Sequence, residues 1–275
     1  MSSLRVTLID VGCGDSILLE ATDRHGDVHF GLIDANDTTY LRSSFIFLKR
    51  FFETKKINQP LFFDFVLLTH EHSDHAQGLK SILREFGAKR FWYPKSLSLS
   101  SFANLIRFAN RSARVQHHES VNSGKILPQF GDVSMEVLWP PWNTIDSNPN
   151  NNSVVLLLRL GNVAVVLTGD AEETVWTQIA PSIPADTEFF KVPHHGSENG
   201  TFDRAGNLCW LPNCPATARL GISTHITPHQ LPDQKVLSAF SGQGMTAVQR
   251  TDEHHHITFE TDGQSSWASY SHREI

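Results

Sequence analysis

The amino-acid sequence predicts an α/β protein folded as a four-layer αββα sandwich. Short strand-like segments alternate with helical segments in both halves of the 275-residue chain. One run, at 64–69, is apolar over the length of a strand, which is typical of a strand covered on both faces. No linker or low-complexity segment separates the halves. Two packed sheets with helices outside them therefore account for the chain as one domain, 1–275.

The first part of the chain is expected to begin with three short strands. The turns "VGCGD" and "DRHGD" separate runs that are rich in leucine, isoleucine and valine. A helix is expected at 40–56, because its apolar residues recur at helical spacing and its end is basic. The strands predicted in this part are 4–10, 16–22, 28–34, 64–69 and 89–94, and the further helices are 76–86 and 98–112.

The second part repeats the alternation. A "GN" pair at 161–162 favours a tight hairpin, and the Asn/Pro-rich segment 143–153 is the longest loop-like stretch. The His-rich "DEHHHI", at 252–257, is expected to be an exposed turn of a closing hairpin. The strands predicted here are 133–140, 153–160, 163–170, one from 187 into "KVPHHGS", 216–223, 245–249 and 256–261, and the helices are 171–180 and 233–240.

Composition limits the partners only weakly. Hydrophobic residues make up 40% and charged residues 19%, as in ordinary globular proteins. The net charge of −6 argues against bulk electrostatic coating of nucleic acid but leaves room for a local basic groove. No leader-like segment and no apolar run of about 20 residues is present, so no membrane association is expected. Three cysteines are too few for a disulfide framework, and a cytoplasmic location is predicted.

The densest group of chemically active residues is "THEHSDH", directly after the apolar run at 64–69. It contains the pattern H-x-H-x-D-H. Imidazoles two residues apart, His70 and His72, can point to one metal ion, while Asp74 and His75 reach a second. Neutral imidazole and carboxylate suit Zn²⁺, with Mn²⁺ or Fe²⁺ as alternatives. The alternative is a solvated loop that is rich in histidine by chance, and four donors at this spacing disfavour it.

This pattern resembles the hallmark of the metallo-β-lactamase superfamily. Further segments are similar to the ComEC-related branch, which includes hydrolase domains of DNA-uptake proteins and their soluble relatives. They occur in the same order as in that branch and cover nearly the whole chain. These segments are "LIDVGCGDSILLE", "NNNSVVLLL", "LTGDAEE", "KVPHHGS" and, more loosely, "GIS…H" at 221–229. The resemblance implies the metallo-β-lactamase fold and a site for two divalent metal ions.

The resemblance also implies roles for two further aspartates. Asp170 matches the aspartate that bridges both metal ions, although an Asp at this place is often a helix N-cap instead. Asp34 matches an aspartate that does not bind metal itself but forms hydrogen bonds to the segment "THEHSDH" at 69–75, which we call the metal loop. Its alternative is a turn-initiating residue in "DAND".

Histidines complete the implied site, and two of their assignments have alternatives. In "KVPHHGS" one histidine is expected on the metal ions and the other toward the substrate. His194 is favoured as the metal ligand and His195 for catalysis, and the reverse stays open. The last ligand is expected to be His229, with His225 as its alternative.

One loop departs from the superfamily pattern. Many members supply a third histidine to the first metal ion from a loop before a strand, but "NPNNNS" has none, as in the ComEC-related branch. Asn152, a water, His117 or His118 could take that place. His72 stands where the branch more often has Asp, which restores a fuller imidazole set.

The expected function is that of a metal-dependent hydrolase. Two metal ions can lower the pKa of a bridging water to about 7 and clamp the oxygens of an ester, so no side-chain nucleophile is needed. Asp74 and His195 are expected to act in catalysis. The predicted substrate is a phosphodiester, either a nucleic acid or a smaller nucleotide-like ester. The alternatives are an ester, lactone or lactam hydrolase of the same fold, or a non-catalytic metal-binding regulatory module. The sequence identifies no protein partner.

Overall fold

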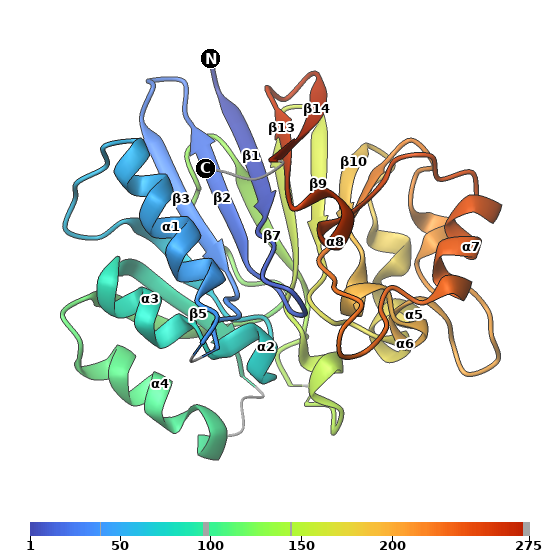
Figure 1. The fold of residues 1–275 in the computed structure, drawn as a ribbon, viewed down its shortest axis with the longest axis horizontal. Coiled ribbons are helices and arrows are strands. Elements are labelled where there is room, and N and C mark those ends of the chain that lie inside the picture. Colours follow the sequence, from blue (N-terminus) through green and yellow to red (C-terminus); the bar gives the residue numbers. More distant parts are fainter. Residues whose placement is uncertain (39, 96–98, 144, 272–275) are drawn as a thin grey trace.

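Two β-sheets pack face to face, and helices cover the outer side of each (Figure 1). The structure is a computed structural model that describes residues 1–38, 40–95, 99–143 and 145–271. The layers run helix, sheet, sheet, helix, so the predicted four-layer αββα sandwich is confirmed. No helix of the described residues is long and apolar enough to cross a membrane.

The first sheet has eight strands, and its two halves differ in direction. The strands up to β3 pair antiparallel, whereas those from β3 to β6 pair parallel. Their spatial order is β14 (Ser266–Ser271), β13 (His256–Thr261), β1 (Ser3–Leu8), β2 (Ile17–Thr22), β3 (Val28–Ile33), β4 (Phe63–Leu67), β5 (Ala88–Pro94) and β6 (Val115–Val121).

The second sheet has six strands and is again part parallel and part antiparallel. The strands from β12 to β9 pair parallel. β8 forms an antiparallel hairpin with β9, and β7 pairs antiparallel with β8. Their order is β12 (Val248–Arg250), β11 (Arg219–Ile222), β10 (Thr187–Lys191), β9 (Val163–Leu167), β8 (Val155–Leu160) and β7 (Ser134–Trp139). The predicted "GN" turn joins β8 to β9.

The helices form the two outer layers, as Figure 1 shows. Phe47, Leu83 and Leu105 belong to the apolar cluster on the outer face of the eight-stranded sheet. Val175 and Phe240 belong to the corresponding cluster on the six-stranded sheet. The first layer contains α1 (Ser43–Thr54), α3 (Leu79–Glu85) and α4 (Leu99–Arg111); the second contains α5 (Glu173–Ile179), α6 (Glu198–Thr201) and α7 (Gln234–Gly242); two short helices are α2 (Ser73–Ala76) and α8 (Thr251–His254).

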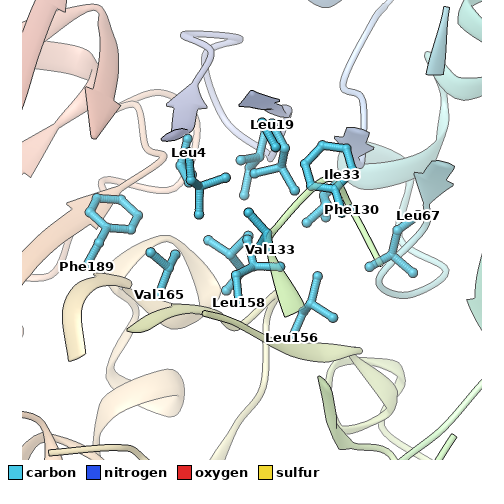
Figure 2. Packing of buried hydrophobic residues seen from close by; sticks show 14 of the residues in the cluster. Leu4, Leu19, Ile33, Leu67, Phe130, Val133, Leu156, Leu158, Val165 and Phe189 are labelled. Carbon is cyan, nitrogen blue, oxygen red and sulfur yellow. The ribbon is translucent and has the colours of Figure 1, made fainter. Parts of the chain in front are cut away.

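The main apolar core lies between the sheets. Alternate residues of each strand point inward, because side chains of a strand alternate between its two faces. Figure 2 shows Leu4, Leu19 and Ile33 of one sheet facing Leu156 and Leu158 of the other. These side chains are essentially inaccessible to solvent. The two sheets are therefore joined by a continuous dry layer that holds their strand ends in fixed relation.

Several predicted elements differ from those observed. The predicted helix at 76–86 is divided at Gly78 into α2 and α3, and residue 98 of the helix predicted at 98–112 lies outside the described residues. Strands β6 and β14 were not predicted. The closing hairpin is wrong, since β12 and β13 lie in different sheets and α8 joins them.

Candidate metal centre

The chain segments that follow the parallel strands meet at one edge of the sandwich. Parallel strands bring their carboxyl ends to the same edge of a sheet, where ligands of α/β proteins usually bind. Asp34 follows β3, the segment 69–75 follows β4, Asp170 follows β9, His195 follows β10 and Ser223 follows β11. Because the two sheets are packed together, both contribute side chains to this edge.

Asp170 lies at the centre of a cluster of histidines. Its carboxylate is 2% exposed, and its Oδ1 has no hydrogen-bond partner. Its Oδ2 lies near ring nitrogens of four histidines, at 3.2 Å from His75 Nε2, 3.4 Å from His195 Nε2, 3.8 Å from His70 Nε2 and 4.0 Å from His194 Nε2. The N-cap position of α5 is Glu172. The alternative N-cap role for Asp170 is therefore not observed.

Two of these histidines are oriented as metal ligands would be. His75 Nδ1 lies 2.7 Å from Asp34 Oδ2, and His195 Nδ1 lies 2.8 Å from the carbonyl oxygen of Ser223. Each Nδ1–H is thereby donated outward. The buried Nε2 atoms of both rings have no hydrogen-bond partner. Such an outer acceptor is what fixes the tautomer and the ring orientation of a metal-binding histidine.

Asp74 completes this donor set. Its Oδ2 lies 3.8 Å from His75 Nε2 and 3.6 Å from His195 Nε2. Asp74, His75 and His195 form one of the groups whose ligand atoms all lie within 4.8 Å of one another. Two imidazole nitrogens without partners, facing two carboxylates, fit a divalent cation.

A second donor set lies on the other side of Asp170. His70, His75 and Asp170 form another group of donors within 4.8 Å of one another. His70 is fully buried, and its Nε2 lies 3.1 Å from His72 Nδ1. The structure thus places His70 and His75 near the Asp170 carboxylate and Asp74 near His75. His72 lies beside His70 but belongs to no donor group among the described residues.

The pKa values of the cluster reflect burial and close charges. Burial opposes a charge on His75 and His195, but the Asp170 carboxylate outweighs it. The pKa of His75 is raised well above its ordinary value, and that of His195 is raised to about 9. Burial, together with the nearby charge of His75, lowers the pKa of His70 well below its ordinary value. Burial would raise the pKa of Asp170, but His195 and His75 hold it well below its usual range.

Asp34 joins the end of β3 to the metal loop at three points. Its Oδ1 accepts a 2.7 Å hydrogen bond from the Thr69 backbone N–H, and its Oδ2 accepts one of 2.6 Å from Thr69 Oγ1. The same Oδ2 contacts His75 Nδ1. Asp34 is fully buried and has a φ of 57°, a left-handed conformation that is rare for non-glycine residues. These contacts hold the metal loop against the neighbouring strand.

The geometry favours the reverse of the expected roles of His194 and His195. His195 is buried and belongs to two of the donor groups. The His194 side chain is 23% exposed, and its Nδ1 lies 3.0 Å from Glu172 Oε1. Both have positive φ, 47° and 55°, so the backbone turns sharply between β10 and α6. This turn directs the two rings differently, which residue order alone does not reveal.

His229 is not brought to the cluster. It is exposed and lines a separate surface cavity together with Pro228 and Gln230. His225 is also exposed, and its Nδ1 accepts a 3.1 Å hydrogen bond from the Thr227 backbone N–H. Neither belongs to a donor group within the described part of the chain. His195, rather than His229 or His225, lies beside Asp170.

The candidates for the missing third histidine are also placed elsewhere. Asn152 closes its own loop, because its side-chain amide bonds Asp146 at both the backbone N–H and the carbonyl. His117 and His118 lie on β6, and His118 Nδ1 lies 3.1 Å from Tyr93 Oη. None of the three belongs to a donor group among the residues described.

The "NPNNNS" loop instead supports Glu172. The amide nitrogens of Asn148 and Asn150 donate to Glu172 Oε2 and Oε1 at 2.7 and 2.8 Å. Burial acts against ionisation, but hydrogen bonds from His194 and Asn150 lower the pKa of Glu172. The loop that lacks a histidine thus fixes the carboxylate that orients His194.

Two buried charges beside the site were not predicted. Lys191 is fully buried, and its Nζ lies 2.6 Å from Asp15 Oδ2, 3.1 Å from the Gly169 carbonyl and 3.8 Å from Asp170 Oδ1. Asp15 ends "VGCGD" and Lys191 begins "KVPHHGS". A lysine at the end of an apolar strand was the available signal.

Comparisons with known proteins agree with this architecture. The family model of the Metallo-beta-lactamase superfamily matches residues 5–208. ComE operon protein 3 of Bacillus subtilis (strain 168) is 30% identical over 269 residues, which are 92% of this chain and 32% of that protein. The chain thus spans about a third of the length of this relative.

Solved structures share the fold at low identity. Unliganded yeast PDE1 is 12% identical with a TM-score of 0.56, over 94% of this chain and 99% of the other. A long form RNase Z from yeast is 9% identical with a TM-score of 0.54, over 99% of this chain and 50% of the other. With the family match over most of its length and the strand-end cluster of histidines and aspartates, the chain belongs to the metallo-β-lactamase superfamily.

Proposed function

We propose that this protein is a metal-dependent phosphodiesterase that binds two divalent ions, Zn²⁺ in the first instance. One observation carries the proposal: two buried imidazole nitrogens without partners, on His75 and His195, face the carboxylates of Asp74 and Asp170. These four residues would hold one ion. His70, His72 and the shared Asp170 would hold the other.

The residues of the chain would have different roles at this site. Bound divalent ions would supply an activated water and positive charge for the oxygens of the ester. Asp34 and the carbonyl of Ser223 hold His75 and His195 in fixed orientations. Of the four histidines around Asp170, His194 has the most exposed side chain. It is therefore the histidine that a substrate can contact.

The choice of a phosphodiester rests on supporting comparisons. Two structures that share this fold over most of the chain are named as a phosphodiesterase and an RNase. The clustered donors need no serine or cysteine nucleophile, which suits hydrolysis by water. A nuclease and a phosphodiesterase of smaller esters both fit this chemistry.

The test is the exchange Asp170→Asn. It keeps the size of the side chain but removes the charge that both donor sets share. We expect metal content to fall and hydrolysis of bis(p-nitrophenyl) phosphate to drop by at least about 100-fold, because even residues outside the metal shell typically contribute 10–100-fold. Asp262→Asn, at an exposed turn, is the matched control and should retain both. Full hydrolysis by Asp170→Asn would contradict the proposal.

The same preparation separates the alternatives. Turnover of nitrocefin or of lactones, with none of the phosphodiester, would assign a carboxylic ester or amide hydrolase. Fewer than about one equivalent of metal after supplementation with Zn²⁺ or Mn²⁺, together with no hydrolysis, would instead favour a binding module.

A further inference from the structure

A groove with four positive charges lies between α3 and α4. Its volume is about 370 Å³, and its walls include Lys80 and Arg84 of α3, and Arg107 and Arg111 of α4. Phe108 also lines the groove, and the Arg84 guanidinium lies 5.9 Å from the centre of its ring. The chain as a whole has a net charge of −6, so this groove is a positively charged region on an otherwise acidic protein.

The positive charges are placed by helical periodicity. Lys80 and Arg84 are four residues apart, as are Arg107 and Arg111, so each pair shares one face of its helix. Like charges at this spacing repel each other. All four side chains are exposed. No carboxylate of the described residues lies within 4.0 Å of their charged nitrogens, although many other cations of the chain have such partners.

The groove begins on the helix that follows the metal-loop segment 69–75 in the chain. Lys80 is five residues after His75, so the chain between them spans at most about 18 Å. Helix α3 then runs away from the site for about 10 Å, with α4 beside it (Figure 1). A strand whose scissile bond lies at the metal centre can therefore pass its neighbouring phosphates along these helices.

We propose that this groove binds the phosphate backbone of a nucleic-acid strand that is held at the metal centre. The inference rests on the proposed phosphodiesterase activity and deepens it, since it names a polymeric substrate rather than a small ester. Guanidinium groups bind phosphate oxygens through paired hydrogen bonds, and three of the four cations are arginines. A small diester has no neighbouring phosphates for them.

The double variant Arg84→Gln/Arg107→Gln tests the groove from both helices. Binding of a fluorescein-labelled, phosphorothioate-linked 20-nucleotide strand is measured by anisotropy at several KCl concentrations. We expect binding to weaken by at least 10-fold. A plot of log K against log salt concentration should also become less steep by about 1.4, because each of the two lost phosphate contacts contributes about 0.7 to the slope for a single strand. The kcat/KM for bis(p-nitrophenyl) phosphate should stay within twofold of the original.

The matched control is Arg204→Gln/Lys235→Gln. It removes the same charge from the turn after α6 and from α7, on the opposite side of the sandwich, and it should bind the strand like the unaltered protein. Equal weakening in both double variants, or unchanged binding in the groove variant, would overturn the inference. So would groove-dependent binding of 30% phosphatidylglycerol vesicles without binding of the strand. Absence of bis(p-nitrophenyl) phosphate hydrolysis in the unaltered protein would refute the proposed function, while the anisotropy result would still report on the groove.

Discussion

At the scale of single residues, the site depends on charges that are buried together. Lys191 has no exposed surface and contacts Asp15, which is itself 1% exposed. Removing one partner of a buried ion pair leaves the other charge without compensation, which costs far more than the pair contributes. Lys191 also bonds the carbonyl of Gly169, next to Asp170. The pair therefore supports the backbone that carries the central carboxylate.

Lys191→Met is accordingly expected to destabilise the protein by about 3–5 kcal/mol, because Asp15 would remain buried without the ammonium group that lies 2.6 Å from it. The double variant Lys191→Met/Asp15→Asn should recover most of that loss. Urea unfolding in the presence of EDTA measures both without a contribution from bound metal. A double variant as unstable as Lys191→Met would show that the charge pairing is not the cause.

Residues close in sequence could be predicted from their spacing, whereas Asp34, Asp170 and the pair His194 and His195 were predicted through the resemblance to the superfamily. His70, His72, Asp74 and His75 occur within six positions, so their spacing alone indicates a metal loop. The pairing of Asp15 with Lys191 spans the two sheets, and no local pattern reveals it. No local pattern reveals either that His229 is exposed and lies outside the donor groups of the described residues.

At the scale of elements, one contact links the loop between β1 and β2 to the metal loop. The Asp15 backbone N–H donates a 3.3 Å hydrogen bond to the Asp74 carbonyl. Gly14 has a φ of 112°, and a Cβ there would overlap the Asp74 carbonyl oxygen and the Asn36 amide. Only glycine allows the two loops to approach so closely.

Gly14→Ala should therefore displace the metal loop, whereas Gly12→Ala should not. Gly12 also has a positive φ, of 79°, but a Cβ there would meet no atom within 4 Å. We expect Gly12→Ala to cost about 1 kcal/mol of backbone strain and to keep its metal, while Gly14→Ala loses metal affinity as well as stability. Chelator competition and urea unfolding measure the two effects. Equal metal affinity in both variants would refute the close-approach argument.

The strands that could not be predicted are those at the sheet edges. β6 reads "VQHHESV" and β14 reads "SWASYS", with polar residues where an inner strand would be apolar. Both form edges of the eight-stranded sheet. An edge strand is exposed along one side and tolerates polar side chains, which removes the apolar signal. Inner strands such as β8 and β9, buried on both faces, were predicted within two or three residues.

At the scale of the whole molecule, the two sheets share the donor set. His70, Asp74 and His75 follow a strand of the eight-stranded sheet, and Asp170 and His195 follow strands of the six-stranded sheet. The alternation of strands and helices was enough to predict the layers. It could not predict which strand ends meet, because that depends on the order of strands within each sheet.

Metal binding should consequently stabilise the packing of one sheet on the other. Zn²⁺ at 100 times its dissociation constant is expected to add about 2.7 kcal/mol to the free energy of unfolding. Calorimetry should show a higher Tm with Zn²⁺ and a lower one after treatment with EDTA. Asp170→Asn should show no such difference, and an equal shift in that variant would indicate binding elsewhere.

The division of donors between the sheets also has a consequence for the order of events during folding. His70 and His195 are 125 positions apart in the chain, and both must reach Asp170. Contacts between residues so distant in sequence close large loops and form late. A nascent chain that ends after β6 holds His70, Asp74 and His75 but still lacks Asp170 and His195. The donor set is thus complete only after strands of both sheets have formed.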